Sequence, residues 1–164
     1  MNIYGYCRIS TAKQSIDRQI RNIKAEYPTA HIVQEAYTGT SIFRPEWLKL
    51  YRILKSGDTV VFDSVSRMSR NAEDGFALYE DLYHKGIRLV FLKEHHIDTE
   101  TYKKALSGSI AMTGTNVDFI LKGINEYLMA LAKEQIKLAF EQSEKEVADL
   151  HQRTREGLLT ARLN

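Results

Sequence analysis

Short apolar runs alternate with longer amphipathic segments over the first hundred residues. This rhythm is typical of βα units that pack around a mainly parallel sheet. The apolar and β-branched runs predict four strands, at residues 2–9, 30–35, 59–62 and 87–92. Turn residues precede the last two strands, with Gly57-Asp58 before one and Gly86 before the other.

Between these runs, apolar residues recur every three or four positions, which is the spacing of a helix with one buried face. The three sets are Ile16, Ile20 and Ile23; Leu48, Tyr51 and Leu54; and Phe76, Tyr79 and Leu82. Pro45 suits the first turn of the second helix, and Asn71 suits the N-cap of the third. The sequence therefore predicts a three-layer α/β fold, with a mainly parallel sheet of four or five strands and crossover helices.

The pattern changes after Lys93. Residues 94–114 are polar and irregular, which predicts a loop with a short helix around residues 102–106. From Asn116 almost to the end of the chain, apolar residues recur every three or four positions without a proline. This predicts one long helix, or two if Gly123 or the neighbourhood of Ala132 breaks it. So long an apolar stripe needs a partner surface, on the domain itself or on a second subunit.

Composition excludes several classes of protein. The chain has 164 residues, of which 43% are hydrophobic and 27% charged, as in an ordinary globular domain. Its one cysteine, Cys7, permits no internal disulfide and favours an intracellular setting. We expect neither export nor a membrane span, because the chain has no signal-like start and no uncharged apolar run of about 18 residues. The net charge of +2 is too small to indicate a polyanionic partner by itself.

Polar side chains follow the carboxyl ends of the first three strands, where open parallel sheets bind their ligands. They are Arg8, Ser10, Gln14 and Gln19 after the first; Glu35, Thr38 and Arg44 after the second; and Ser66, Arg67, Ser69 and Arg70 after the third. Guanidinium groups match the geometry of phosphate oxygens and stay charged. A serine among arginines, rather than beside a histidine and an aspartate, favours attack on a phosphodiester over acyl transfer. The sequence therefore predicts a phosphate site at this edge.

Other motifs indicate less. Neither GxGxxG nor GxxxxGK[ST] occurs, so the common nucleotide-binding fingerprints are absent from the sequence. We expect no metal site at His95-His96, because neighbours in an extended loop point opposite ways and no further ligand spacing accompanies them. Cys7 is predicted to be a small core side chain. Glu35, at a strand end, either orients an arginine or is a solvated or helix-capping carboxylate.

Three motifs together resemble the catalytic domain of the serine site-specific recombinases, the resolvase and invertase family. They are residues 6–11 with Gln14 and Gln19, the loop of residues 39–44 before a helix, and residues 66–70 after the third strand. The resemblance covers nearly the whole chain. Residues 94–135 and the pair Arg153-Thr154 further resemble the large recombinases of conjugative transposons and phages. By that resemblance the chain is a fragment that lacks its DNA-binding domains.

The resemblance implies an enzyme that recombines DNA without a metal or other cofactor. Ser10 would attack a phosphodiester and become joined to the 5′ phosphate, releasing a 3′ hydroxyl. Arg8, Arg67 and Arg70 would hold the scissile phosphate and help to activate Ser10 or the leaving hydroxyl. The supporting residues would be Gln14, Gln19, Arg44 and Ser66.

The resemblance also implies partners and a location. The partner would be double-stranded DNA at recombination sites, bound in the bacterial cytoplasm by homodimers that join into a homotetramer and exchange strands by rotation. Residues 1–135 would be the catalytic domain, and residues 136–164 a long helix for oligomerisation and DNA contact, with self-association through the stripe from Ile136 to Thr154. Arg153, Arg155 and Arg162 either lie near the DNA minor groove or form a solvated helix face.

Two positions depart from the family pattern. Many members have an aspartate where this chain has Ser66, and Asp149 lies where smaller members place an arginine before the Arg-Thr pair. If that aspartate carries a proton, this chain must use another group; if it orients an arginine, a hydroxyl can partly replace it. A regulatory or assembly protein that has the same fold, binds DNA and cleaves weakly or not at all is therefore the main alternative. A nucleotide-binding module of flavodoxin-like type is the second.

Overall fold

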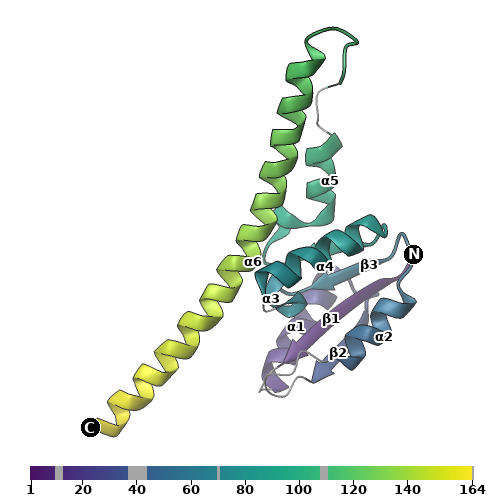
Figure 1. The fold of residues 1–164 in the computed structure, drawn as a ribbon. Helices are drawn as coiled ribbons and strands as arrows, with labels where there is room; N and C mark the ends of the chain where they lie inside the picture. The colour runs from purple at the N-terminus through teal and green to yellow at the C-terminus, as the bar shows by residue number, and fades with distance from the viewer. Residues whose placement is uncertain (10–12, 37–43, 70, 108–110, 164) are drawn as a thin grey trace.

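The computed structural model describes residues 1–9, 13–36, 44–69, 71–107 and 111–163. Four strands form one parallel sheet in the order β2-β1-β3-β4 (Figure 1). They are β1 at Ile3–Ile9, β2 at His31–Ala36, β3 at Thr59–Phe62 and β4 at Arg88–Phe91. Each predicted strand is confirmed to within about one residue at either end.

Helices connect and cover these strands. They are α1 at Lys13–Glu26, α2 at Pro45–Ile53, α3 at Val65–Met68, α4 at Ala72–His84, η1 at His95–Ile97, α5 at Thr99–Ser107 and α6 at Asp118–Leu163. The three predicted crossover helices are α1, α2 and α4. Pro45 occupies the first turn of α2, and the side chain of Asn71 caps α4 by accepting the N–H groups of Glu73 and Asp74. The four-residue α3 was not predicted, because so short a helix has no periodic signal.

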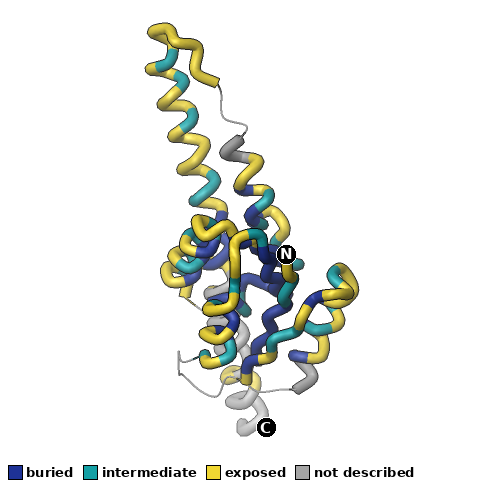
Figure 2. The backbone as a smooth tube through the Cα atoms, turned by 90° about the vertical axis from the view of Figure 1, so that its right-hand side faces the viewer, coloured by how far each residue is buried: buried dark blue, intermediate teal, exposed yellow. Residues whose placement is uncertain are grey.

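The sheet is covered on both faces, which confirms the three-layer prediction, and burial is concentrated along its strands (Figure 2). One face carries Cys7, Val61 and Val90, which pack against Ile16 and Ile23 of α1. The other carries Tyr6, Phe62, Leu89 and Phe91, which pack against Trp47 of α2, Tyr79 and Leu82 of α4 and Phe140 of α6. Successive side chains of a strand point to opposite faces, so adjacent residues such as Tyr6 and Cys7 serve different layers. Cys7 is fully buried, as predicted.

The region after β4 is more helical than predicted. The short helix expected around residues 102–106 is confirmed as part of the nine-residue α5, and η1, which was not predicted, precedes it. α6 is one helix of 46 residues that begins at Asp118 and continues through Gly123 and Ala132. The predicted boundary at residues 135 and 136 therefore falls within this helix. Tyr102 of α5 and Leu128 and Leu131 of α6 line a shared apolar groove, a long-range pairing that local sequence patterns do not report.

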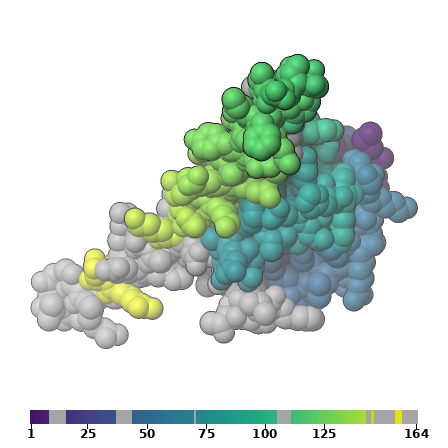
Figure 3. All heavy atoms as spheres, turned by 45° about the horizontal axis from the view of Figure 1, so that its top comes forward, coloured from purple at the N-terminus to yellow at the C-terminus, as the bar shows by residue number. Residues whose placement is uncertain are grey.

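α5 and residues 118–135 of α6 form a unit that we call the helical arm. It stands away from the sheet in Figure 1, and Figure 3 shows the same segment as a ridge beyond the layered body. Within the described residues, no helix is long and apolar enough to cross a lipid bilayer.

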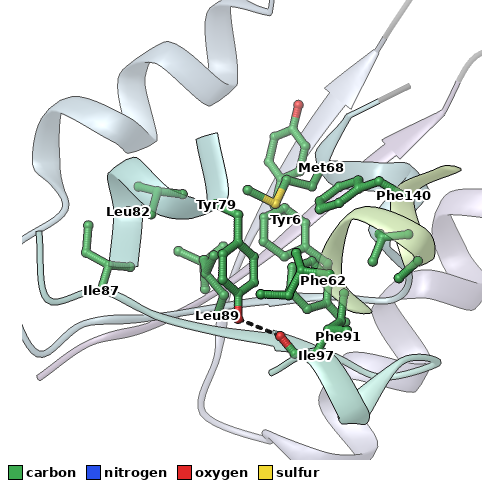
Figure 4. Close-up of a cluster of buried hydrophobic side chains, with 14 of the residues drawn as sticks. Tyr6, Phe62, Met68, Tyr79, Leu82, Ile87, Leu89, Phe91, Ile97 and Phe140 are labelled. Carbon is green, nitrogen blue, oxygen red and sulfur yellow. Dashed lines mark hydrogen bonds between the residues drawn. The ribbon is translucent and has the colours of Figure 1, made fainter. Parts of the chain in front are cut away.

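The start of the predicted self-association stripe is instead part of the chain's own core. Ile136, Ala139 and Phe140 are buried, at 2%, 7% and 2% exposure, and pack with residues of α4 and β4 (Figure 4). The Phe140 ring lies 6.5 Å from that of Phe91, centroid to centroid. Because this stretch of α6 covers the sheet, it does not present these three side chains to a partner. Among the side chains of α6 that the structure describes, the exposed large apolar residues include Phe119, Ile120, Ile124, Tyr127 and Leu131 before this stretch, and Leu138 within it.

Candidate active site

The first strand extends past its neighbour β3. β1 pairs with β2 as far as Ile9 and Ala36, but with β3 only as far as Tyr6 and Phe62. β2 lies on one side of β1 and β3 on the other, so the strand order reverses at this point. Open α/β sheets bind ligands where their order reverses, outside the carboxyl ends of the strands. We call the carboxyl ends of β1 and β3, with the residues that follow them, the carboxyl edge.

Gln19 of α1 holds the end of β1. Its Oε1 accepts the Arg8 N–H at 3.1 Å, and its Nε2 donates to the Arg8 carbonyl at 3.0 Å. A side-chain amide carries both a donor and an acceptor, so it takes the place of a further β3 residue beside the protruding strand. The side chain is only 1% exposed, so these two bonds are made away from water. Gln19 therefore keeps β1 extended immediately before the segment that contains Ser10.

The side chains of Arg8 and Arg67 each donate a hydrogen bond to a backbone carbonyl at or next to the other arginine. Arg8 Nη2 donates to the carbonyl of Ser66, and Arg67 Nη1 donates to the carbonyl of Arg8 at 3.3 Å. Arg8 is 5% exposed, and Arg67 is half-buried. The two predicted site arginines, 59 positions apart in sequence, are thus brought together where β1 and β3 separate. They concentrate positive charge at this point of the edge.

Arg44 joins the same edge from the start of α2. Its Nη1 donates to the carbonyl of Met68 at 2.7 Å, and its guanidinium lies 6.0 Å from the centroid of the Trp47 ring. The Tyr6 hydroxyl lies nearby, and burial raises its pKa to about 12 even though the charge of Arg44 acts in the opposite direction. Tyr6 therefore stays protonated at neutral pH and donates to Glu35 Oε2 at 3.3 Å.

Glu35 caps α2, one of the interpretations that the sequence left open. Its Oε2 accepts the Trp47 N–H at 2.9 Å, and its Oε1 accepts that of Glu46 at 3.4 Å. Pro45 has no N–H, so these are the first two donors of the helix. The carboxylate is 1% exposed. Glu35 therefore fixes the start of α2, next to Arg44.

Several predicted site residues lie outside what the structure describes. Ser10 and Arg70 are among the undescribed residues, as is the side chain of Gln14. Their described neighbours lie at the carboxyl edge, since Ile9 ends β1 and Ser69 follows α3. The functions assigned to Ser10, Arg70 and Gln14 remain predictions.

Ser66 belongs to a chain of two hydroxyls and a carboxylate. Its Oγ lies 3.1 Å from Ser64 Oγ, which donates to Glu94 Oε1 at 3.2 Å. The other oxygen of Glu94 accepts the Val65 N–H at 3.1 Å. Burial raises the pKa of Glu94, while these hydrogen bonds and the charges of Lys93 and His96 act in the opposite direction. Sequence reasoning missed Glu94 because it considered only three strand ends; the same rule applied to β4 finds it.

Asp63, the acidic residue nearest before Ser66, faces the other side of the sheet. It is 2% exposed, accepts from Asn22 Nδ2 at 2.9 Å and pairs with Lys93 Nζ at 3.4 Å. Burial, and secondly the charge of Asp63, raises the pKa of the Cys7 thiol to about 12. Cys7 is therefore an unreactive core residue at neutral pH.

His95 and His96 lie in η1, not in an extended loop as predicted. His95 Nδ1 is 2.7 Å from Asp98 Oδ2, and its Nε2 is 3.7 Å from Glu26 Oε2. Among the described residues, no three His, Cys, Asp or Glu side chains are grouped so as to hold a metal ion.

The predicted DNA contacts lie on the far part of α6. Arg155 is exposed, and the side chains of Arg153, Arg162 and Asp149 are outside the described set. In Figure 1 this part of α6 runs beyond the sheet, toward the C-terminus. Both interpretations, a DNA contact and a solvated face, remain open.

An open parallel sheet with arginines gathered where its strand order reverses defines a class of α/β domain that binds phosphate groups at its strand ends. Residues 3–146 match the family described as "Resolvase, N terminal domain". The chain belongs to this family, the catalytic domain of serine site-specific recombinases, and this favours the recombinase prediction over a nucleotide-binding module.

Known relatives agree with this assignment. The chain is 28% identical to the Tn21 resolvase of Escherichia coli over 159 residues, which cover 93% of this chain and 83% of that one. It is 33% identical to a resolvase of Clostridium perfringens over 99 residues, 59% of this chain and 52% of the relative. A resolvase family site-specific recombinase from Streptococcus pneumoniae aligns with 100% of this chain and 99% of its own, with a TM-score of 0.47 and 21% identity. The relatives from Escherichia coli and Clostridium perfringens are both named resolvases, which agrees with the family but not with the narrower resemblance to large recombinases.

Proposed function

We propose that this chain cleaves and rejoins DNA at specific sites, with Ser10 as the nucleophile. Ser10 Oγ attacks a backbone phosphorus and loses its proton, and the bond from phosphorus to the 3′ oxygen breaks. The products are a phosphoserine link to the 5′ phosphate and a free 3′ hydroxyl. Attack by a 3′ hydroxyl on that link reverses the step and releases Ser10. The observation that carries this proposal is that backbone carbonyls hold Arg8 and Arg67 close together beside the end of β1.

The arginines supply what this chemistry requires. Phosphoryl transfer spreads negative charge over the non-bridging oxygens, so catalysis depends on alignment and on fixed positive charge. Arg8 and Arg67 are held by backbone carbonyls and Arg44 by that of Met68, so the cations are positioned before DNA binds. Arg70, next to Ser69, would complete the set.

The partners follow from the family. The substrate would be double-stranded DNA, cut by a homotetramer built from two homodimers, which exchanges strands by rotating one half against the other. This would occur in the bacterial cytoplasm, with α6 leading toward further DNA-binding domains as in the large recombinases. The continuous helix from Asp118 to Leu163, which runs beyond the sheet, supports this arrangement.

Covalent capture tests the proposal and identifies the target site in the same experiment. Fragments of the DNA that flanks the gene are incubated with the protein and then denatured; DNA ends attached to protein are recovered and sequenced. We expect 5′ ends that cluster at one sequence with the natural chain and none with Ser10→Ala. Arg52→Ala, an exposed arginine at the far end of α2, is the matched control and should capture DNA normally.

A second candidate function is that of a DNA-bound regulator without cleavage activity, which Ser66 favours because many relatives have an aspartate there. It predicts specific binding to the same flanking DNA and no covalent capture with either protein.

A further inference from the structure

We infer that Glu94 is a positioning residue for the recombination reaction, acting through Ser64 and Ser66 on the segment that carries Arg67. The inference rests on the proposed function, because it concerns the cations expected to hold the scissile phosphate. It adds the carboxyl end of β4 to a site that sequence reasoning built from the first three strands.

Glu94 connects the end of β4 to the start of α3. Its backbone N–H donates to the Phe91 carbonyl at 3.1 Å, which ties it to the sheet. Its two carboxylate oxygens accept from the Ser64 hydroxyl at 3.2 Å and the Val65 N–H at 3.1 Å. A helix of four residues has almost no internal hydrogen bonds to hold its orientation. The position of α3 therefore depends on such external contacts.

The donor and the acceptor can be assigned for each hydroxyl hydrogen bond that links Ser66, Ser64 and Glu94. Ser64 has a single hydroxyl proton, and it is donated to Glu94. In the 3.1 Å contact between the two serines, Ser66 must therefore be the donor and Ser64 the acceptor. Ser64 Oγ also accepts the Ser66 N–H at 3.3 Å. An ionised Glu94 thus orients both hydroxyls and holds Ser66 through two contacts with Ser64.

Ser66 connects these hydroxyl hydrogen bonds to the two arginines. Its carbonyl accepts from Arg8 Nη2, and the next residue is Arg67, whose Nη1 returns to the Arg8 carbonyl. A shift of Ser66 would therefore move the partner of one cation and the backbone of the other. Glu94 itself contacts neither arginine in any of these bonds, so its effect is indirect.

The test compares Glu94→Gln with Glu94→Gln/Ser64→Ala in the capture reaction, using DNA of the captured sequence. The amide has the size of the carboxylate but is neutral and brings donors of its own. We expect Glu94→Gln to lower the cleavage rate at saturating DNA roughly tenfold to a hundredfold, the usual effect of losing a charged hydrogen-bond partner. The DNA concentration for half-maximal rate should change little. Ser64→Ala should slow cleavage similarly, and the double variant no further, because both residues act along one path.

Glu100→Gln is the matched control, because Glu100 lies on α5, away from α3, and forms a surface ion pair with Arg88 of β4. It should cleave at the natural rate, and thermal unfolding should show every variant folded. Natural-rate cleavage by Glu94→Gln, or fully additive losses in the double variant, would overturn the inference while leaving the proposed function standing. Failure of the natural chain to form any Ser10-dependent adduct would overturn both.

Discussion

The carboxyl edge and the helical arm place polar and apolar side chains in opposite ways. At the edge, Arg8 and Gln19 are 5% and 1% exposed, and both bind backbone groups of neighbouring elements. On the arm, Phe119 and Ile120 are 90% and 65% exposed. Burial of a charge costs free energy unless hydrogen bonds compensate for the lost solvation. An exposed aromatic ring gains no free energy from the removal of apolar surface from water. Neither region follows the usual rule of polar outside and apolar inside.

This difference indicates that largely different residues determine the stability of the fold and its function. Apolar burial is concentrated instead in the two layers that cover the sheet, one under α1 and the other, rich in aromatic rings, under α2, α4 and α6 (Figure 4). The edge gives up some of that stability to hold cations in place. Exposed apolar surfaces of this kind commonly mark sites of association. We therefore expect substitutions in these layers to affect folding, those at the edge to affect mainly catalysis, and those of exposed residues on the arm to affect neither in the isolated chain.

The largest effect is expected where α6 joins the body. Phe140→Ala should lower the free energy of unfolding by about 3–5 kcal/mol, because it removes a buried ring and leaves a cavity over Phe91. Phe119→Ala, the same change on the arm, should alter it by about 0.5 kcal/mol or less. Urea unfolding of both variants measures the contrast. Equal losses would mean that the arm is part of the core.

At the edge, Arg67→Ala should slow covalent capture by roughly 100- to 1,000-fold, about 3 to 4 kcal/mol, the usual result of removing one well-aimed donor. Single-turnover capture at saturating DNA measures it, with Arg52→Ala as the control. A loss in stability comparable with the loss in rate would contradict the separation of the two regions, so unfolding is measured in parallel.

Gln19→Ala should show an intermediate effect on both properties. It leaves the buried N–H and carbonyl of Arg8 without this partner, which costs about 1–3 kcal/mol of stability. It should also slow capture, because the end of β1 is no longer held. Asn22→Ala on the same helix, which removes a bond to Asp63 on the other face, should leave the rate of capture unchanged.

The smallest effect is a pH dependence at η1. The hydrogen bond to Asp98 raises the pKa of His95 above its ordinary 6.5, with further support from Glu26. A raised pKa in the folded state stabilises the protein at low pH, and this contribution is lost as the pH rises from about 6.5 through the folded pKa. Burial raises the pKa of Asp98 as well, which favours neutral Asp98. His95→Gln removes this contribution, so the change in melting temperature between pH 6 and pH 8 should become smaller by about a degree or two. The effect is small because the ring is half exposed to solvent. An unchanged profile would assign that dependence to other groups.

Sequence reasoning succeeded where the information was local. Apolar periodicity located β1 to β4 and three crossover helices, and Pro45 and Asn71 marked the starts of two of them. It located α5 and the start of α6 approximately, but it did not predict that the two line one groove, because that pairing joins segments that are separated along the chain. It also assigned Ile136 and Phe140 to a partner, because a helical stripe looks the same whether it faces its own sheet or another subunit.

For the site, the sequence by itself determined the chemical groups and the edge at which they gather, because the ends of parallel strands meet on one side of a sheet. Only the tertiary structure decided which backbone carbonyl each arginine binds, that Glu35 caps a helix, and that Glu94 reaches Ser64. The reason is physical: a hydrogen bond requires two atoms within about 3 Å. Relative positions at that scale follow from how helices pack on the sheet, which no local pattern of residues encodes.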